Sequence, residues 1–275
     1  MSALLESRDR MMPSDAVARV VEVVLHPLPY FTLILEAPAL YAGIAAGQFV
    51  MLETTGSLEP YLRRAFSVAD VSNGPGGVRI ELLGKVVGRG TLAMATLAPG
   101  DERRVLGPLG RGFTLPAAGR VALVAGGVGS APLLLTARQL AARAVAFDVF
   151  YGGRGAVDLP RADELEAWAR RAGGRLVAVT EDGSRGERGL VTAALVAALD
   201  AGERYDATFS CGPMAMLAAV ASISMARGLP GEAALETEMG CGFGACLGCA
   251  IPHVSGRYAL CCKDGPVFRL DEVRW

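Results

Sequence analysis

The chain has 275 residues, more than one domain usually holds, so we expect two or three domains that each bury their own core. Hydrophobic residues make up 52% of it and charged residues 20%, with a formal net charge of −1, so the chain offers no positive field for nucleic acid. The longest uncharged runs, residues 121–137 and 239–256, are broken by glycine and proline, which argues against membrane insertion.

Residues 1–14 are predicted to be an N-terminal tail. This segment carries several charged side chains and lacks the apolar core of a signal peptide. We therefore expect a cytoplasmic protein whose thiols stay reduced. A framework of disulfides is then the least favoured explanation for its six cysteines.

Residues 15–115 have the pattern of a small antiparallel β barrel or sandwich. Short apolar runs alternate with proline and glycine, as in strands joined by turns. One helix is expected at residues 91–98, and residues 101–113 close the unit. The expected strands are residues 16–24, 31–37, 47–53, 65–71 and 78–84.

Residues 116–232 alternate apolar strands with amphipathic helices. This alternation predicts a parallel sheet whose strands are joined by right-handed crossovers. The expected strands are residues 121–125, 145–151, 175–180 and 205–211, and the expected helices begin near Pro132, Arg161, Leu190 and Met214.

Residues 233–275 lose this regularity. From Glu236 onward the segment is rich in glycine and cysteine, and we expect something other than a hydrophobic core to organise it. Clustered cysteines in a reduced compartment are more typical of a metal or catalytic site than of disulfides. The cysteines of this segment are Cys241, Cys246, Cys249, Cys261 and Cys262, whereas Cys211 stands alone.

The spacing Cys241-x4-Cys246-x2-Cys249, followed by a later cysteine, is typical of a plant-type 2Fe-2S cluster. A structural zinc site would pair two short cysteine knuckles, and an inert group of buried cysteines is a further alternative. The intervening glycines favour iron, because a loop around a cluster needs unusual backbone angles and close N–H contacts to sulfur. Adjacent side chains point in different directions, so either Cys261 or Cys262 is the fourth ligand.

Two glycine-rich turns could hold phosphates. Gly126, Gly127 and Gly129 follow an expected strand and open a helix, whose free N–H groups suit a phosphate or nicotinamide. Residues 85–91 form a second such turn before the helix expected at residue 91. Each could equally be an ordinary tight turn.

Arg63 and Arg64 precede a strand that carries Phe66 and Ser67. A guanidinium can bind a pyrophosphate through two hydrogen bonds, an aromatic ring can flank a planar cofactor, and a hydroxyl can bond to a ring nitrogen. Without further context, arginines beside a strand are usually a solvated edge.

Taken in order, these motifs resemble the ferredoxin–NADP reductase superfamily and, most closely, the electron-transfer subunits of NAD-dependent dihydroorotate dehydrogenase. The resemblance covers residues 16–275. It implies an N-terminal flavin-binding β barrel over residues 15–115, a nucleotide-binding α/β domain over residues 116–232, and a C-terminal 2Fe-2S domain over residues 233–275.

For the flavin, the family's Arg-x-x-Ser element is matched by residues 64–67. The match implies Arg64 on the FAD pyrophosphate and Ser67, a catalytic candidate, beside the isoalloxazine ring. Ala65 and Phe66 stand where close relatives have proline and an aliphatic residue. The further flavin-side residues implied are Lys85, Gly90 and Thr91.

For the dinucleotide, motifs at the ends of successive strands imply a site at one edge of the sheet. Glu181 and Asp182 would suit a free ribose hydroxyl and favour NAD over NADP, whereas Arg154 could favour a phosphate. Cys211 matches the position near the nicotinamide and is the second catalytic candidate. The implied binding residues are Gly126, Gly127, Gly129, Arg154, Asp182, Cys211, Gly212 and Pro213.

For the cluster, members of the family carry the last cysteine immediately before x-Asp-Gly-Pro-Val-Phe, and this selects Cys262. The implied metal ligands are Cys241, Cys246, Cys249 and Cys262.

The resemblance implies a subunit that takes electrons from dihydroorotate oxidation on an FMN-containing partner and passes them through a 2Fe-2S cluster and FAD to NAD+, in pyrimidine biosynthesis. It also implies a heterotetramer with two copies of each subunit. One alternative keeps the fold as the diaphorase subunit of a hydrogenase, sulfide dehydrogenase or transhydrogenase complex; the other is a non-catalytic redox sensor or zinc-binding module. His26 and His253 lie outside the motifs, so histidine acid–base catalysis finds no support.

Overall fold

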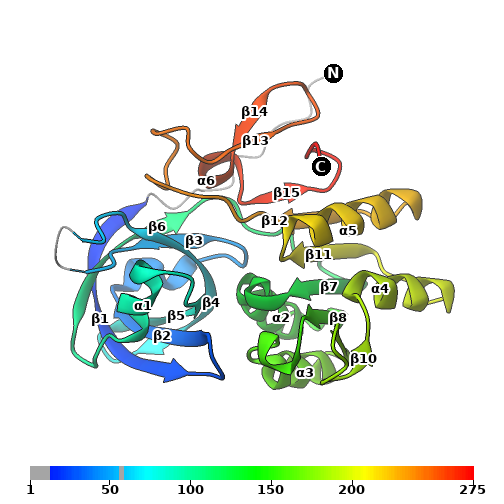
Figure 1. Ribbon diagram of the computed structural model, residues 1–275, viewed down its shortest axis with the longest axis horizontal. Coiled ribbons are helices and arrows are strands. Elements are labelled where there is room, and N and C mark those ends of the chain that lie inside the picture. The colour runs from blue at the N-terminus through cyan, green and yellow to red at the C-terminus, as the bar shows by residue number, and fades with distance from the viewer. Residues whose placement is uncertain (1–12, 56–58) are drawn as a thin grey trace.

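The computed structural model describes residues 13–55 and 59–275 and shows a barrel, an α/β unit and a smaller C-terminal unit that contacts both (Figure 1). Residues 1–12 of the predicted tail lie outside the described residues. Within the described part of the chain, no helix is long and apolar enough to cross a membrane.

The N-terminal unit is a closed antiparallel barrel with the strand order β1-β2-β5-β4-β3-β6, which confirms the predicted architecture. Alternating side chains fill its interior, with Phe31, Leu33 and Leu82 fully buried. Its strands are β1 (Ser14–Leu25), β2 (Tyr30–Ala37), β3 (Phe49–Leu52), β4 (Arg64–Gly74), β5 (Gly77–Lys85) and β6 (Glu102–Leu109). The short helices are η1 (Ala39–Gly43) and α1 (Arg89–Ala95), the latter close to the helix expected at residues 91–98.

The second unit is a parallel sheet covered by helices on both faces, as predicted. Its strands are β7 (Arg120–Gly126), β8 (Ala146–Gly153), β9 (Leu176–Thr180), β10 (Glu187–Arg188), β11 (Ala207–Cys211) and β12 (Gly231–Ala234), in the order β10-β9-β8-β7-β11-β12. Helices α2 (Ser130–Ala142) and α3 (Ala162–Arg171) pack into one apolar core, and α4 (Val191–Asp200) and α5 (Met214–Ala226) into another. Single turns, η2 (Gly127–Gly129) and η3 (Ala156–Asp158), follow β7 and β8.

The C-terminal unit corrects one expectation, because a hydrophobic core does organise it. Its elements are β13 (Ala250–Pro252), β14 (Tyr258–Leu260), α6 (Cys261–Asp264) and β15 (Val267–Arg269), and β15 adds to the central sheet antiparallel to β12. Ile251, Phe268 and Leu270 are buried in the same core as α4 and α5. Strands of three residues are too short to show a repeating pattern, so the sequence did not reveal this packing.

The barrel meets the α/β unit along the outer face of β4 and β5. Ala69 and Leu83 of the barrel are buried in the core that contains α2 and α3. The C-terminal unit joins this arrangement at the end of β6, where the backbone N–H of Arg111 donates to the carbonyl of Gly265. The three units therefore meet around the carboxyl end of the central sheet, which positions the site described next.

Candidate functional site

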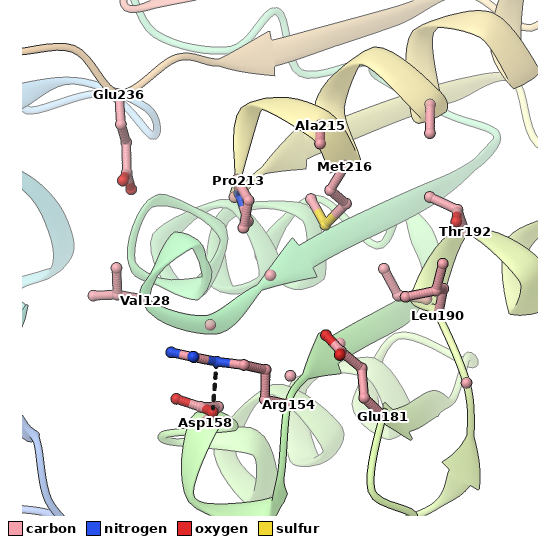
Figure 2. Close-up of a pocket in the computed structure, with 18 of the residues that line it drawn as sticks. Val128, Arg154, Asp158, Glu181, Leu190, Thr192, Pro213, Ala215, Met216 and Glu236 are labelled. Carbon is pink, nitrogen blue, oxygen red and sulfur yellow. Dashed lines mark ion pairs between the residues drawn. The ribbon is translucent and has the colours of Figure 1, made fainter.

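A pocket of about 470 Å³ opens at the carboxyl ends of β7, β8, β9 and β11 (Figure 2). This is where an open α/β sheet binds its ligands. The structure brings six of the predicted cofactor-binding residues to its lining: Lys85, Gly126, Gly127, Arg154, Gly212 and Pro213. Glu181, one of the acidic pair singled out from the sequence, also lines the pocket, whereas the sequence prediction missed Tyr30, Asp158 and Glu236.

The glycines after β7 have different positions. Gly126 and Gly127 border the pocket. Gly127 has a backbone φ of +56°, an angle that residues with a side chain rarely adopt. Gly129 packs against β11, because a Cβ there would lie 2.4 Å from the carbonyl oxygen of Cys211. Gly129 therefore lets the glycine turn approach β11, whereas Gly126 and Gly127 form the edge of the pocket.

Cys211 and Glu236 form a polar pair beside the pocket. Cys211 is fully buried, and its Sγ lies 3.9 Å from Oε1 of Glu236. Burial and the neighbouring carboxyl raise the pKa of Cys211, so it stays a thiol. The surrounding protein raises the pKa of Glu236 as well, while its carboxyl remains accessible from the pocket, toward which it points in Figure 2. Glu236 therefore presents a carboxyl group with a raised pKa at the pocket wall.

The acidic residues after β9 separate into two roles. Glu181 lines the pocket, where Figure 2 shows its carboxylate opposite Met216. Asp182, the residue predicted from sequence, instead accepts hydrogen bonds from the hydroxyl and the backbone N–H of Ser184, at 2.6 and 2.8 Å. These bonds lower the pKa of Asp182. Of the two carboxylates, Glu181 is therefore the one that lines the pocket.

Replacing Glu181 by glutamine is expected to weaken NAD+ binding and to reduce discrimination against NADP+ by about tenfold, because a hydrogen bond to a charged group contributes roughly 1.5–3 kcal/mol. The measurement is the dissociation constant of each dinucleotide by fluorescence titration. Asp182→Asn is the matched control and should leave the ratio unchanged. An equal effect of both substitutions would contradict the separation of roles.

The predicted flavin strand presents alternate residues to opposite faces. Phe66 is buried in the barrel core, with its ring centroid 6.4 Å from that of Phe31 in an edge-on arrangement. Ala65 is exposed and Ser67 half-buried, and Ala69 of the same strand packs against the α/β unit. Ala65 and Ser67 therefore face outward near the domain junction, whereas the Phe66 ring stabilises the barrel.

Arg64 and Gly90 lie together at the start of α1. A Cβ on Gly90 would be 2.8 Å from Nε of Arg64, and the Arg64 guanidinium donates to the carbonyl of Leu62. The hydroxyl of Thr91 accepts from the backbone N–H of Val87 at 2.9 Å and thereby closes the turn. Lys85 lies apart from this group: its Nζ is 3.7 Å from Oδ1 of Asp158, in the pocket wall.

Three of the predicted cluster cysteines lie in the loop of residues 235–249, and the fourth, Cys262, lies in α6. Sγ of Cys249 and Sγ of Cys262 are 3.2 Å apart, and the backbone N–H of Cys246 donates to Sγ of Cys241 at 3.5 Å. Among the described residues, no three metal-binding side chains already surround a single point. The loop between them adopts left-handed backbone angles at Gly242, Gly244 and Leu247.

The chemistry of these sulfurs fits a bound metal. Burial alone would raise the pKa of Cys241, but backbone N–H groups of Cys246 and Phe243 that donate to its sulfur lower it to about 6. Burial and the nearby Cys249 raise the pKa of Cys262 to about 12. Two thiolates this close would repel each other, and a metal cation between the sulfurs would offset that repulsion and displace the proton that the raised pKa keeps on Cys262. Donors of this kind suit iron or zinc.

Cys261 points elsewhere. It is fully buried, and its thiol donates to the carbonyl of Leu235 at 3.4 Å. Burial raises its pKa to about 11, so it remains protonated. The structure thus places Cys262 beside Cys249 and Cys261 against the strand end that leads to Glu236.

Comparisons with known proteins find a matching family for the cysteine-rich segment and another for the α/β unit. Residues 236–274 match the model of the iron–sulfur cluster binding domain of dihydroorotate dehydrogenase B, and residues 123–222 match the oxidoreductase NAD-binding domain.

Among similar proteins, the electron transfer subunit of dihydroorotate dehydrogenase B (NAD(+)) from Desulforamulus reducens is 35% identical over 264 residues, covering 94% of this chain and 97% of the relative. The subunit of the same name from Bacillus caldolyticus is 38% identical over 233 residues, covering 82% and 86%. A solved structure of the NADH-dependent reduced ferredoxin-NADP oxidoreductase superposes with a TM-score of 0.83 at 29% identity, covering 96% and 92% of the two chains.

Proposed function

Since the chain belongs to the family of electron transfer subunits of NAD-dependent dihydroorotate dehydrogenase B, we propose that it passes electrons from a catalytic partner to NAD+ by way of a 2Fe-2S cluster and FAD. When bound, the cluster supplies single electrons and the flavin converts them into the hydride that nicotinamide accepts. Cys241, Cys246, Cys249 and Cys262 would hold the cluster, and Arg64 and Ser67 would hold the flavin.

One observation carries this proposal: the segment that Cys261 contacts leads directly to the pocket. The thiol of Cys261 donates to the carbonyl of Leu235, and the next residue, Glu236, borders the pocket. Cys262, a proposed ligand, is adjacent to Cys261 in the chain. This contact supports the proposal, because electron transfer needs its centres held close together in a fixed geometry.

The residues around the pocket would position the dinucleotide, and they include a protonated group. Gly126 and Gly127 leave room for a dinucleotide against the backbone, and Glu181 accepts a bond from its ribose. Glu236 places its carboxyl group, with a raised pKa, next to the thiol of Cys211, which stays protonated.

The surface beside the cysteines supports a protein partner. Phe243 and Leu247 lie between the predicted ligands and are 56% and 62% exposed. Apolar side chains exposed in this way are typical of an interaction surface. We propose that an FMN-containing dihydroorotate dehydrogenase subunit docks there, in a cytoplasmic complex of two copies of each subunit.

The test is co-expression with candidate catalytic subunits, followed by assays of flavin, iron and NAD+-linked dihydroorotate oxidation. We expect a complex that contains FMN, FAD and iron and produces orotate with NADH. A complex that lacks dihydroorotate activity but reduces NAD+ from another partner would overturn the assignment.

The solved-structure comparison favours a second candidate with the same fold. This chain superposes with a TM-score of 0.83 on a chain of the NADH-dependent reduced ferredoxin-NADP oxidoreductase structure. A diaphorase subunit of that kind would co-purify with a second flavin and iron–sulfur protein in place of an FMN subunit.

A further inference from the structure

One hydrogen bond joins the two large units at the edge of the pocket. Tyr30 begins β2 of the barrel and is 2% exposed. Its hydroxyl donates to Oδ1 of Asp158, at the end of η3, over 2.6 Å. Burial, followed by this carboxylate, raises the pKa of Tyr30, so the hydroxyl remains a donor. The bond connects residues that are 128 positions apart in the chain.

The same bond forms part of the pocket wall. Tyr30, Lys85 and Asp158 all line the pocket, although the first two belong to the barrel. The Lys85 ammonium lies 5.2 Å from the centroid of the Tyr30 ring, and this cation–π contact holds the ring from one side. The Tyr30 hydroxyl is 3.6 Å from the point where a Cβ on Gly127 would be. The barrel thus supplies one side of the space next to the glycine turn.

Lys85 also contacts Asp158 across the two units, at 3.7 Å in the pocket wall, whereas two further ion pairs between the units lie away from the pocket. Arg161 pairs with Glu81 of β5 at 2.7 Å, and Arg138 of α2 pairs with Asp70 of β4 at 2.6 Å. These ion pairs join the units without bordering the pocket. Figure 2 shows that Asp158, in contrast, faces the pocket beside Arg154, whose Nε is 3.9 Å from its Oδ2.

We propose that Tyr30, acting through Asp158, is a positioning residue for the dinucleotide: it fixes the barrel wall of the pocket against the glycine turn. This inference rests on the proposed function, because it takes the pocket to be the NAD+ site. A wall that is already in place reduces the ordering cost of binding, so the loss of this bond should weaken binding without any change of charge.

The test is NAD+ binding to the Tyr30→Phe holoprotein, with its flavin and iron contents measured. We expect the dissociation constant to rise about fivefold to tenfold, equivalent to about 1.0–1.4 kcal/mol, with flavin and iron unchanged. Tyr41→Phe is the matched control, because the Tyr41 hydroxyl makes bonds of 2.6 and 3.0 Å entirely inside the barrel. Glu81→Gln removes an ion pair between the units elsewhere. Both controls should lower the unfolding temperature and leave the dissociation constant unchanged.

A double-mutant cycle separates positioning from a general loss of stability. In an Asp158→Ala background, the added Tyr30→Phe change should alter the dissociation constant by less than about twofold, since its partner is already gone. Full additivity in the cycle would overturn the proposal. So would wild-type affinity in Tyr30→Phe, and so would an equal loss of affinity in Tyr41→Phe. Absence of NAD+ binding by the wild-type protein would overturn the proposed function together with this inference.

Discussion

Replacing Cys262 by serine is expected to abolish iron binding, whereas replacing the adjacent Cys261 by serine is expected to preserve it. The Cys262 sulfur lies 3.2 Å from that of Cys249, and the Cys261 thiol points away, to the carbonyl of Leu235. A serine hydroxyl keeps its proton at neutral pH and is a poor ligand for iron, so the loss of one thiolate leaves the cluster incomplete. The measurement is iron and acid-labile sulfide per chain, together with the visible absorption of anaerobically purified protein.

Cys261→Ser is the matched control, because it makes the same chemical change one residue earlier. A serine hydroxyl can still donate to Leu235, so we expect a loss of only about 1 kcal/mol in the free energy of unfolding. Wild-type iron content in Cys262→Ser would refute the ligand assignment. Zinc in place of iron in the wild-type protein would support the binding-module alternative.

Replacing Arg64 by alanine is expected to release the flavin. The Arg64 guanidinium lies beside Gly90, at the turn that opens α1, where a pyrophosphate could be held. The loss of its charge-assisted hydrogen bonds should raise the dissociation constant for FAD about a hundredfold, equivalent to about 2.7 kcal/mol. The measurement is the flavin-to-protein ratio after gel filtration, with FAD titration of the stripped protein.

Arg63→Ala is the control for this prediction. Arg63 binds both carboxylate oxygens of Asp15, at 3.0 and 2.9 Å, and is therefore already occupied within the barrel. Such a half-exposed pair contributes little, so we expect near-normal flavin content and a loss of stability below about 1 kcal/mol. Flavin loss from Arg63→Ala alone would indicate that the neighbouring arginine is the one that binds FAD.

The sequence predicted the main elements well where their patterns are long. The barrel strands and the helices near Pro132, Arg161, Leu190 and Met214 appear close to their expected positions. Period-two and helical patterns of that length reflect which side of each element is buried, and burial determines the fold. β10, β12 and β15 were missed, because two to four residues cannot show such a pattern.

The site was harder to predict because its members come from distant segments. The cysteine spacing and the first glycine turn are local signals: Gly126 and Gly127 line the pocket, and the cysteine segment matches an iron–sulfur cluster binding domain. Glu181 and Asp182 differ by one position, and only the loop geometry shows which of them faces the pocket. Tyr30 carries no local signal at all, because its role depends on a contact with Asp158 that folding creates.

The antiparallel strand β15 also bears on how the protein is made. Val267–Arg269 closes the edge of the central sheet next to β12 and follows every other strand of that sheet in the chain. During translation, the barrel and the earlier strands can fold while that edge stays open, as N-terminal units generally fold first. The segment that carries Cys262 is then anchored only after β15 has been synthesised and has paired with β12.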